Sequence, residues 1–146
     1  MKKLLILFLL PFTTLVALSQ PIVGRWKTID DDSGEARSVV EIFERDGLYH
    51  GKIVKLYLAP EEDPDPVCTA CEDHRKGQKI IGMEIISHMK YDQRNEVYHK
   101  GEIVDPENGN VYDCKLWIDN NSGNLKVRGY LLFFYRTQTW LPYEGD

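Results

Sequence analysis

Short segments rich in β-branched and aromatic residues follow one another along the chain, and none keeps the 3.6-residue period of an amphipathic helix. In Leu48–Leu58, the apolar residues Leu48, Val54, Leu56 and Leu58 share one face of a strand, and Tyr49, Ile53 and Tyr57 share the other. Eight strands are predicted, at Ile22–Ile29, Arg37–Glu44, Leu48–Leu58, Ile80–Lys90, Glu96–Val104, Asn110–Asp119, Asn124–Leu132 and Phe133–Leu141. The chain is therefore predicted to be all-β.

Turn signals separate nearly all of these segments. Arg45-Asp46-Gly47 is typical of a hairpin, because glycine takes the positive φ that such turns need. In Asp105–Gly109, Pro106 presets the φ of a type I turn and Gly109 suits the left-handed position that closes it. The boundary between the last two strands is placed near Phe133, where no turn residue marks it.

Consecutive hairpins build an antiparallel, up-and-down meander. A meander of about eight strands can close into a barrel and so remove its two edges, leaving an interior that holds side chains or one small ligand. The predicted fold is an eight-stranded, up-and-down barrel, and an open sandwich is the alternative.

The segment Ala59–Lys79 interrupts the strand pattern with three prolines, two cysteines and a cluster of acidic residues. A loop of this length is uncommon in a compact domain and is often functional. It is predicted to be a lid over one end of the barrel, and the alternative is an inert excursion held by a disulfide.

The first residues have the three parts of an export signal. Two lysines come first, Leu4–Leu10 is an unbroken apolar run, and Ala17-Leu18-Ser19 supplies the small residues of a cleavage site. We expect residues 1–19 to be a signal peptide that is cleaved before Gln20, leaving residues 20–146 as one domain. A retained anchor helix is the alternative, although the run is shorter than the roughly 20 apolar residues of a membrane span.

The charge balance excludes some partners. The chain has 18 basic and 23 acidic residues and a net charge of −5, which argues against a nucleic-acid surface. No second apolar stretch follows the export signal, so no membrane-spanning domain is expected.

Three cysteines, Cys68, Cys71 and Cys114, leave at least one thiol without a partner in the chain. An exported protein permits a disulfide, either Cys68–Cys71 or one of these two with Cys114. Together with His74, the cysteines also have a plausible spacing for a zinc site. A redox role is the third alternative, but the acidic neighbours of this motif would raise a thiol pKa rather than lower it.

Gly24-Arg25-Trp26 opens the first predicted strand. If Gly24 and Trp26 point into the barrel, the glycine leaves room for the indole at the barrel floor. Because the first and last strands of a closed barrel are neighbours, Arg136 is expected to stack across Trp26 through its planar guanidinium. The alternative is an exposed Arg136 on a polar strand face.

Three carboxylates fall among apolar strand neighbours: Glu41, Glu84 and Glu102. They are expected on the solvated faces of their strands, and the alternative is a position inside the barrel that requires a charged partner. His50 and His88 lie on different predicted strands, where they can meet a carboxylate such as Glu84.

A set of longer motifs runs through the chain: Gly24-Arg-Trp-Lys-Thr-Ile-Asp-Asp31, Cys68-x-x-Cys71, Ile81-Gly82, Gly101–Gly109, Tyr112-x-Cys114-Lys115-Leu116, Lys126–Tyr130 and Arg136–Trp140. Gly24-x-Trp26 with Arg136 resembles the structural signature of the lipocalin and calycin barrels. The full set resembles a family of small exported bacterial proteins, domain of unknown function 2147. This resemblance implies a lipocalin-like barrel in the periplasm or outside the cell, and it assigns no catalytic residue.

The leading functional hypothesis is a non-enzymatic protein, with no cofactor, that binds a small, partly apolar ligand in the barrel mouth. No His-Glu-x-x-His motif or Ser/His/Asp arrangement is legible from spacing, although triads assemble only in space. The candidate lining residues are Tyr57, Arg128, Tyr130 and Arg136. The loop 59–79 is the candidate lid.

Two alternatives use other parts of the chain. A cell-envelope protein–protein module would use the acidic loop or the run Phe133-Phe134-Tyr135, in which at least one ring is expected to be exposed. Packing of this run against the long loop is the simpler expectation. The other alternative is a thiol or metal site at Cys68, Cys71 and His74.

Overall fold

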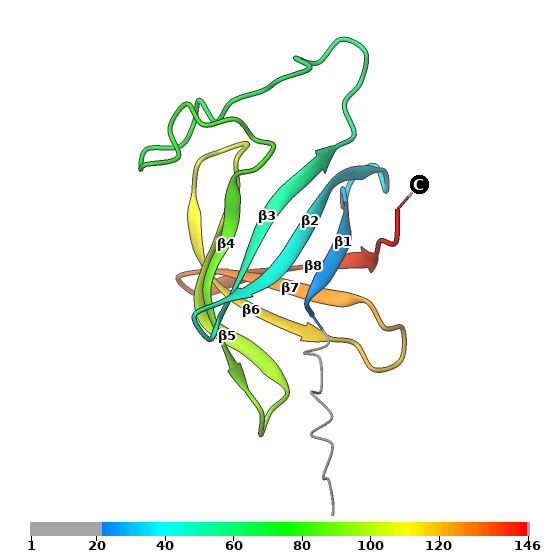
Figure 1. The fold of residues 1–146 in the computed structure, drawn as a ribbon, viewed down its shortest axis with the longest axis vertical. Coiled ribbons are helices and arrows are strands. Elements are labelled where there is room, and N and C mark those ends of the chain that lie inside the picture. The colour runs from blue at the N-terminus through cyan, green and yellow to red at the C-terminus, as the bar shows by residue number, and fades with distance from the viewer. Residues whose placement is uncertain (1–21, 146) are drawn as a thin grey trace, which may run out of the picture.

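The computed structural model describes residues 22–145 (Figure 1). The predicted signal peptide at 1–19 and its cleavage site lie outside the described residues, as does the start of the domain predicted at 20–146. Within residues 22–145, no helix has the length and apolar character needed to cross a membrane.

Eight antiparallel strands close into one barrel in which each strand pairs with its neighbours in sequence and β8 pairs with β1. The strands are β1 (Gly24–Ile29), β2 (Ala36–Arg45), β3 (Leu48–Leu56), β4 (Glu84–Asp92), β5 (Val97–Val104), β6 (Val111–Ile118), β7 (Leu125–Leu131) and β8 (Phe134–Pro142). The prediction of an all-β, up-and-down, eight-stranded barrel is confirmed, and the alternative of an open sandwich is wrong.

Most strand bounds differ from the prediction by one to four residues, and the β7–β8 boundary falls near Phe133 as predicted. β4 begins at Glu84 rather than Ile80, because Ile80 donates its amide to the carbonyl of Pro66 and Gly82 takes a φ of 91° in a turn. The β7–β8 connection is a two-residue turn, Leu132-Phe133, in which Leu132 takes a φ of 53°. A bulky residue rarely occupies this left-handed region, so the sequence carries no sign of the turn.

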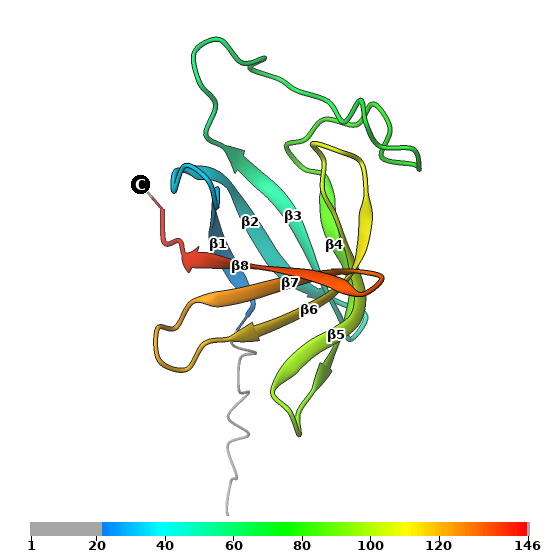
Figure 2. The same cartoon turned by 180° about the vertical axis from the view of Figure 1, so that it is seen from behind.

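Alternate connections lie at the same end of an up-and-down barrel. The connections β1–β2, β3–β4, β5–β6 and β7–β8 therefore share one end, which is the mouth (Figures 1 and 2). The β3–β4 connection, residues 57–83, is the longest and extends over this end as the green segment in Figure 1.

The opposite end, the floor, is filled by side chains. Trp26 is buried, and its indole Nε1 donates to the carbonyl of Ile22 at 2.8 Å. The Tyr98 ring contacts the rings of Tyr49 and Tyr91, with centroids 4.8 and 4.6 Å apart. These contacts close the barrel below the cavity at its mouth.

Arg136 does not stack across Trp26 as expected. In the β1–β8 register Trp26 lies opposite Pro142, and Arg136 precedes Pro142 by six residues of an extended strand, about 20 Å. The same register brings Arg136 to the mouth, where its Nε and Nη2 donate to Asp31 Oδ2 at 2.8 and 2.6 Å. Arg136 therefore joins β8 to the β1–β2 turn rather than locking the floor.

Candidate functional site

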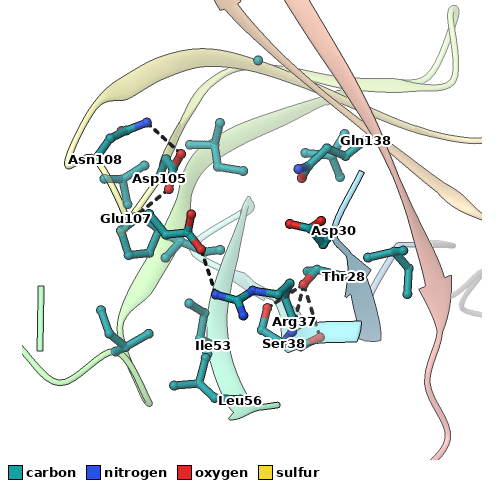
Figure 3. Close-up of a pocket in the computed structure, with 18 of the residues that line it drawn as sticks. Thr28, Asp30, Arg37, Ser38, Ile53, Leu56, Asp105, Glu107, Asn108 and Gln138 are labelled. Carbon is teal, nitrogen blue, oxygen red and sulfur yellow. Dashed lines mark hydrogen bonds and ion pairs between the residues drawn. The ribbon is translucent and has the colours of Figure 1, made fainter. Parts of the chain in front are cut away.

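A cavity of about 830 Å³ occupies the mouth end of the barrel (Figure 3). Its apolar walls come from strand residues that face inward, among them Ile53, Leu56, Ile85, Ile103, Val127 and Trp140. The long loop adds Leu58, Pro66, Val67 and Ile80. The cavity therefore lies between the filled floor and the loop 57–83.

Polar side chains from three strands interrupt this apolar lining. Thr28 Oγ1 and Ser38 Oγ lie 2.8 Å apart and are hydrogen-bonded, and both residues line the cavity. Gln138 Oε1 accepts a hydrogen bond from the indole of Trp140 at 3.2 Å, which leaves the Gln138 amide NH₂ as a further donor. A ligand in this cavity meets both apolar walls and hydrogen-bonding groups.

Arg37 joins the β5–β6 turn to the long β3–β4 loop, and Figure 3 shows its contact with Glu107. From β2, its Nη2 donates to Glu107 Oε1 of the β5–β6 turn at 3.1 Å, and its Nη1 lies 3.7 Å from Glu62 Oε1 of the long loop. All three residues line the cavity. This group, Arg37 with Glu62 and Glu107, is called the mouth latch below, and the spacing of its members in the sequence gave no sign of it.

Carboxylates dominate the edge of the mouth. They are Asp30, Asp31, Asp32, Glu35, Glu61, Glu62, Asp63, Asp65, Asp105 and Glu107. Amide and hydroxyl hydrogen bonds from Ser33 hold the pKa of Asp30 below its ordinary value, so this carboxylate stays charged. The net negative charge at the mouth disfavours an anionic ligand. Arg37 and Arg136 are the cationic side chains that line the cavity there.

The structure separates the four predicted lining residues into two pairs. Tyr57 and Arg136 line the cavity. Arg128 and Tyr130 alternate with the inward residues Val127 and Gly129 and lie on the outer face of β7. Arg128 donates to Thr137 Oγ1 at 2.7 Å on that outer face.

Tyr57 has an unusual environment. Its ring lies beside two ammonium groups, with Lys55 Nζ at 4.8 Å and Lys27 Nζ at 5.7 Å from the centroid. Its hydroxyl is the one buried side-chain polar atom in residues 22–145 that has no hydrogen-bond partner there. Neither lysine lines the cavity, so the Tyr57 ring lies at the wall of the barrel rather than inside the cavity.

The cysteine loop is stapled by a Cys68–Cys71 disulfide, which confirms one of the two predicted pairings. Cys114 is a free thiol that faces the barrel interior between Gly101 and Gly129 of the neighbouring strands. Burial raises the pKa of Cys114 to about 12. It cannot act as a thiolate near neutral pH.

The predicted metal site is not assembled. Cys68 and Cys71 are bonded to each other, and the His74 side chain is 78 % exposed. Among residues 22–145, no group of three or more His, Cys, Asp or Glu side chains is placed to hold a metal ion.

The long loop is fixed to the barrel at two further points. Arg75 is buried in the loop, forms several hydrogen bonds with Asp73 and approaches Glu102 of β5 at 3.9 Å. Gly109 of the β5–β6 turn lies so close to Ala70 that an added Cβ would be 2.0 Å from the Ala70 carbonyl oxygen. The segment between residues 66 and 80 is therefore held in one position beside the mouth.

Acid is expected to loosen this loop. Side-chain and backbone hydrogen bonds from Arg75 lower the pKa of Asp73 from its ordinary 3.8 to about 2. A carboxyl with a depressed pKa stabilises the folded loop above pH 3.8, and the contribution is lost as the pH falls toward 2. Pepsin cleavage within residues 57–83 should accelerate across this interval more in the wild type than in Asp73→Asn, which lacks the titrating group. Equal acceleration in both proteins would contradict this role.

A second charged cluster lies on the outside of the barrel. His50 is buried although it faces outward, and its Nδ1 lies 2.6 Å from Glu84 Oε1. Burial opposes ionisation of Glu84, but hydrogen bonds from Arg45 and His50 outweigh it and lower the pKa of Glu84. The His88 ring packs edge-on to His50 at 5.2 Å. Of the two histidines, His50 meets Glu84 as expected and His88 contacts His50 instead, at a place remote from the cavity.

The other two strand carboxylates also lie outside the lumen. Glu41 pairs with Arg25 and Lys52 on the outer face of β1–β3, at 3.6 and 3.3 Å. Glu102 accepts a hydrogen bond from Ser87. None of the three carboxylates lines the cavity.

Comparison with solved structures gives the fold relationship. The chain superposes on protein HP1028 from the human pathogen Helicobacter pylori, described as belonging to the lipocalin family, with a TM-score of 0.68 and 15 % sequence identity. The match covers 84 % of this chain and 82 % of the other, so the barrel is lipocalin-like. No curated protein matches the sequence. The model of one family, described as "Uncharacterized protein conserved in bacteria (DUF2147)", matches residues 24–141, and the chain belongs to this family.

Proposed function

We propose that this protein binds one small, partly apolar molecule in the barrel mouth and does not catalyse a reaction. The cavity of about 830 Å³ carries the proposal, because it falls within the ~300–1,000 Å³ of typical ligand pockets. An eight-stranded barrel is also just wide enough to hold one small ligand. The lipocalin-like fold adds an argument by analogy only.

The lining defines the chemistry of the proposed ligand. An apolar body would contact Ile53, Leu56 and Ile85. Hydrogen-bonding groups would meet Gln138 and the hydroxyls of Thr28 and Ser38. The carboxylates at the mouth favour a neutral or cationic molecule over a fatty-acid anion. The loop 59–79 is the proposed lid, since several of its side chains line the cavity.

The cellular location belongs to the same proposal. The export-signal pattern at residues 1–19 supports release into the periplasm or to the outside of the cell. There the Cys68–Cys71 disulfide is chemically stable. The alternative of a thiol or metal site has less support, because this disulfide removes two of its ligands.

Filling the cavity should abolish binding without unfolding the barrel. Gly129 lines the cavity, its φ is not positive, and an added Cβ would meet nothing nearer than 3.5 Å. Gly129→Trp therefore places an indole in the space that a ligand would use. We expect binding of the neutral fluorophore N-phenyl-1-naphthylamine to weaken at least tenfold, or about 1.4 kcal/mol, in a fluorescence titration.

The matched control is Lys90→Trp, which adds the same indole at an exposed position of β4 outside this cavity. It should bind the fluorophore like the wild type. Circular dichroism and melting temperature would show whether each variant keeps its fold. Undiminished binding by a folded Gly129→Trp, or the lack of saturable binding by the wild type, would refute the proposal.

A further inference from the structure

The turn between β7 and β8 presents a continuous apolar surface to solvent. The turn and the strand residues beside it, Leu131 to Tyr135, include no charge, and Leu132, Phe133 and Phe134 are 89, 96 and 78 % exposed. This segment is called the apolar tip. It does not pack against the long loop, which corrects the expectation from the sequence. In Figures 1 and 2 the tip lies on the side of the barrel away from the C-terminal residues.

The fold gains little from the side chains of Leu132 and Phe133, which are almost fully exposed. Leu132 holds a φ of 53° that glycine would adopt without strain, and it buries almost no surface. Single exposed apolar residues are common, but a contiguous exposed run marks a site of contact. The sequence of the tip therefore points to a partner outside the chain.

Aromatic and cationic side chains follow the tip along the outer face of β6–β8. Tyr130 and Tyr135 are cross-strand partners with ring centroids 6.1 Å apart. The guanidinium of Arg128 lies over the Tyr135 ring at 4.3 Å and over the Trp117 ring at 5.0 Å. Lys115, which pairs with Arg128 in the β6–β7 register, lies 5.7 Å from the Trp117 ring. Along the outer face of the strands, with increasing distance from the tip, the side chains are first apolar, then aromatic, then cationic.

This order matches the layers of a phospholipid surface. Apolar side chains of interfacial proteins enter about 5–10 Å into the boundary between headgroups and acyl chains, aromatic rings collect at headgroup level, and cations meet anionic phosphates. Phe133 in the turn and Tyr135 in β8 are two residues apart, a span of at most about 7 Å, which suits that depth. Asp113 pairs with Tyr130 across β6 and β7, and Tyr130 pairs with Tyr135 across β7 and β8. The negative charge of Asp113 is offset by Lys115 and Arg128, the next outward-facing pair along β6 and β7, further from the tip.

We propose that the apolar tip inserts into the surface of a phospholipid bilayer, with Arg128 and Lys115 at the lipid phosphates. A second copy of the chain fits less well, because a stable interface uses roughly 20–30 residues from each partner and the tip offers five. Leu131 and Phe134 also line the cavity, so insertion brings the mouth next to the bilayer. The carboxylates of the mouth then oppose a strongly anionic surface, so the apolar side chains supply most of the binding. The inference does not depend on the identity of any ligand.

Co-sedimentation with vesicles tests the proposal. The wild type should bind vesicles of phosphatidylglycerol and phosphatidylethanolamine, and the double variant Leu132→Gly/Phe133→Ser should bind them at least tenfold more weakly. The variant keeps its fold, since glycine relieves the positive φ and Phe133 is 96 % exposed. Its melting temperature should equal or exceed that of the wild type.

A second variant tests the cationic layer. Arg128→Gln should weaken binding to phosphatidylglycerol vesicles and lose part of its salt dependence, while weak binding to phosphatidylcholine vesicles should not change. Undiminished vesicle binding by the folded double variant would refute insertion. Absence of wild-type binding would also refute it, and a dimer in solution that the double variant abolishes would assign the tip to a second copy instead. The fluorophore titration of Gly129→Trp tests ligand binding in the cavity, so its outcome is independent of vesicle binding by the tip.

Discussion

Replacing Trp26 with alanine should lower the free energy of unfolding by about 3–5 kcal/mol, the range for deleting a buried aromatic side chain. The indole is 6 % exposed, lies in the floor of the barrel and belongs to the one large cluster of buried side chains. The substitution also removes the hydrogen bond from Nε1 to the carbonyl of Ile22. Equilibrium unfolding in guanidinium chloride, with the disulfide intact, measures the change.

Two further substitutions separate packing from hydrogen bonding. Trp26→Phe keeps most of the buried ring and should cost about 1–3 kcal/mol, the penalty for a buried carbonyl without its donor. Trp117→Ala removes an indole that is half-buried on the outer face of β6 and should cost less than Trp26→Ala. Equal unfolding free energies for wild type and Trp26→Ala would show that the floor does not anchor the barrel.

The fold was largely predictable because most of its turns contain residues that favour a specific turn conformation. Three connections share one pattern, an aspartate followed four residues later by a glycine: Asp30–Gly34, Asp105–Gly109 and Asp119–Gly123. In each, the glycine amide donates to the aspartate carbonyl, and the glycine φ lies between 72° and 74°. Local chemistry of this kind fixes hairpins, and consecutive hairpins leave few topologies open.

The position of the β7–β8 turn was predicted near Phe133, but its geometry was not, because it breaks that chemistry. Leu132 occupies a position that favours glycine, so no turn residue marks the end of β7. The same departure from local rules identifies the apolar tip. Sequence reasoning of this kind is expected to fail at functional sites, where local preference is overridden.

The candidate site was predictable only in part. Strand parity and closure brought Tyr57 and Arg136 to the mouth, but placed Arg128 on the wrong face. The mouth latch was missed because Arg37 and Glu107 are 70 residues apart and meet only when two connections converge. The sequence also left the cysteine pairing open, since the inward position of Cys114 follows from the barrel register.

Gly109→Ala is the second substitution with a large expected effect. Alanine at a φ of 74° costs about 1–2 kcal/mol, and its Cβ would lie 2.0 Å from the Ala70 carbonyl oxygen. Overpacking of this kind costs about 1–3 kcal/mol more, because the neighbour is backbone held by the Cys68–Cys71 disulfide. The total loss in unfolding free energy should be about 2–5 kcal/mol.

Gly123→Ala is a matched control within the same chain. Gly123 closes an equivalent turn at the floor end, with a φ of 72° and nothing within 4 Å of an added Cβ. Gly123→Ala should lower the free energy of unfolding only by the backbone cost of alanine at a positive φ, about 1–2 kcal/mol. The difference between the two variants measures the contact between the β5–β6 turn and the cysteine loop. If both variants lose the same stability, the cysteine loop moves aside without cost and is not held against the β5–β6 turn.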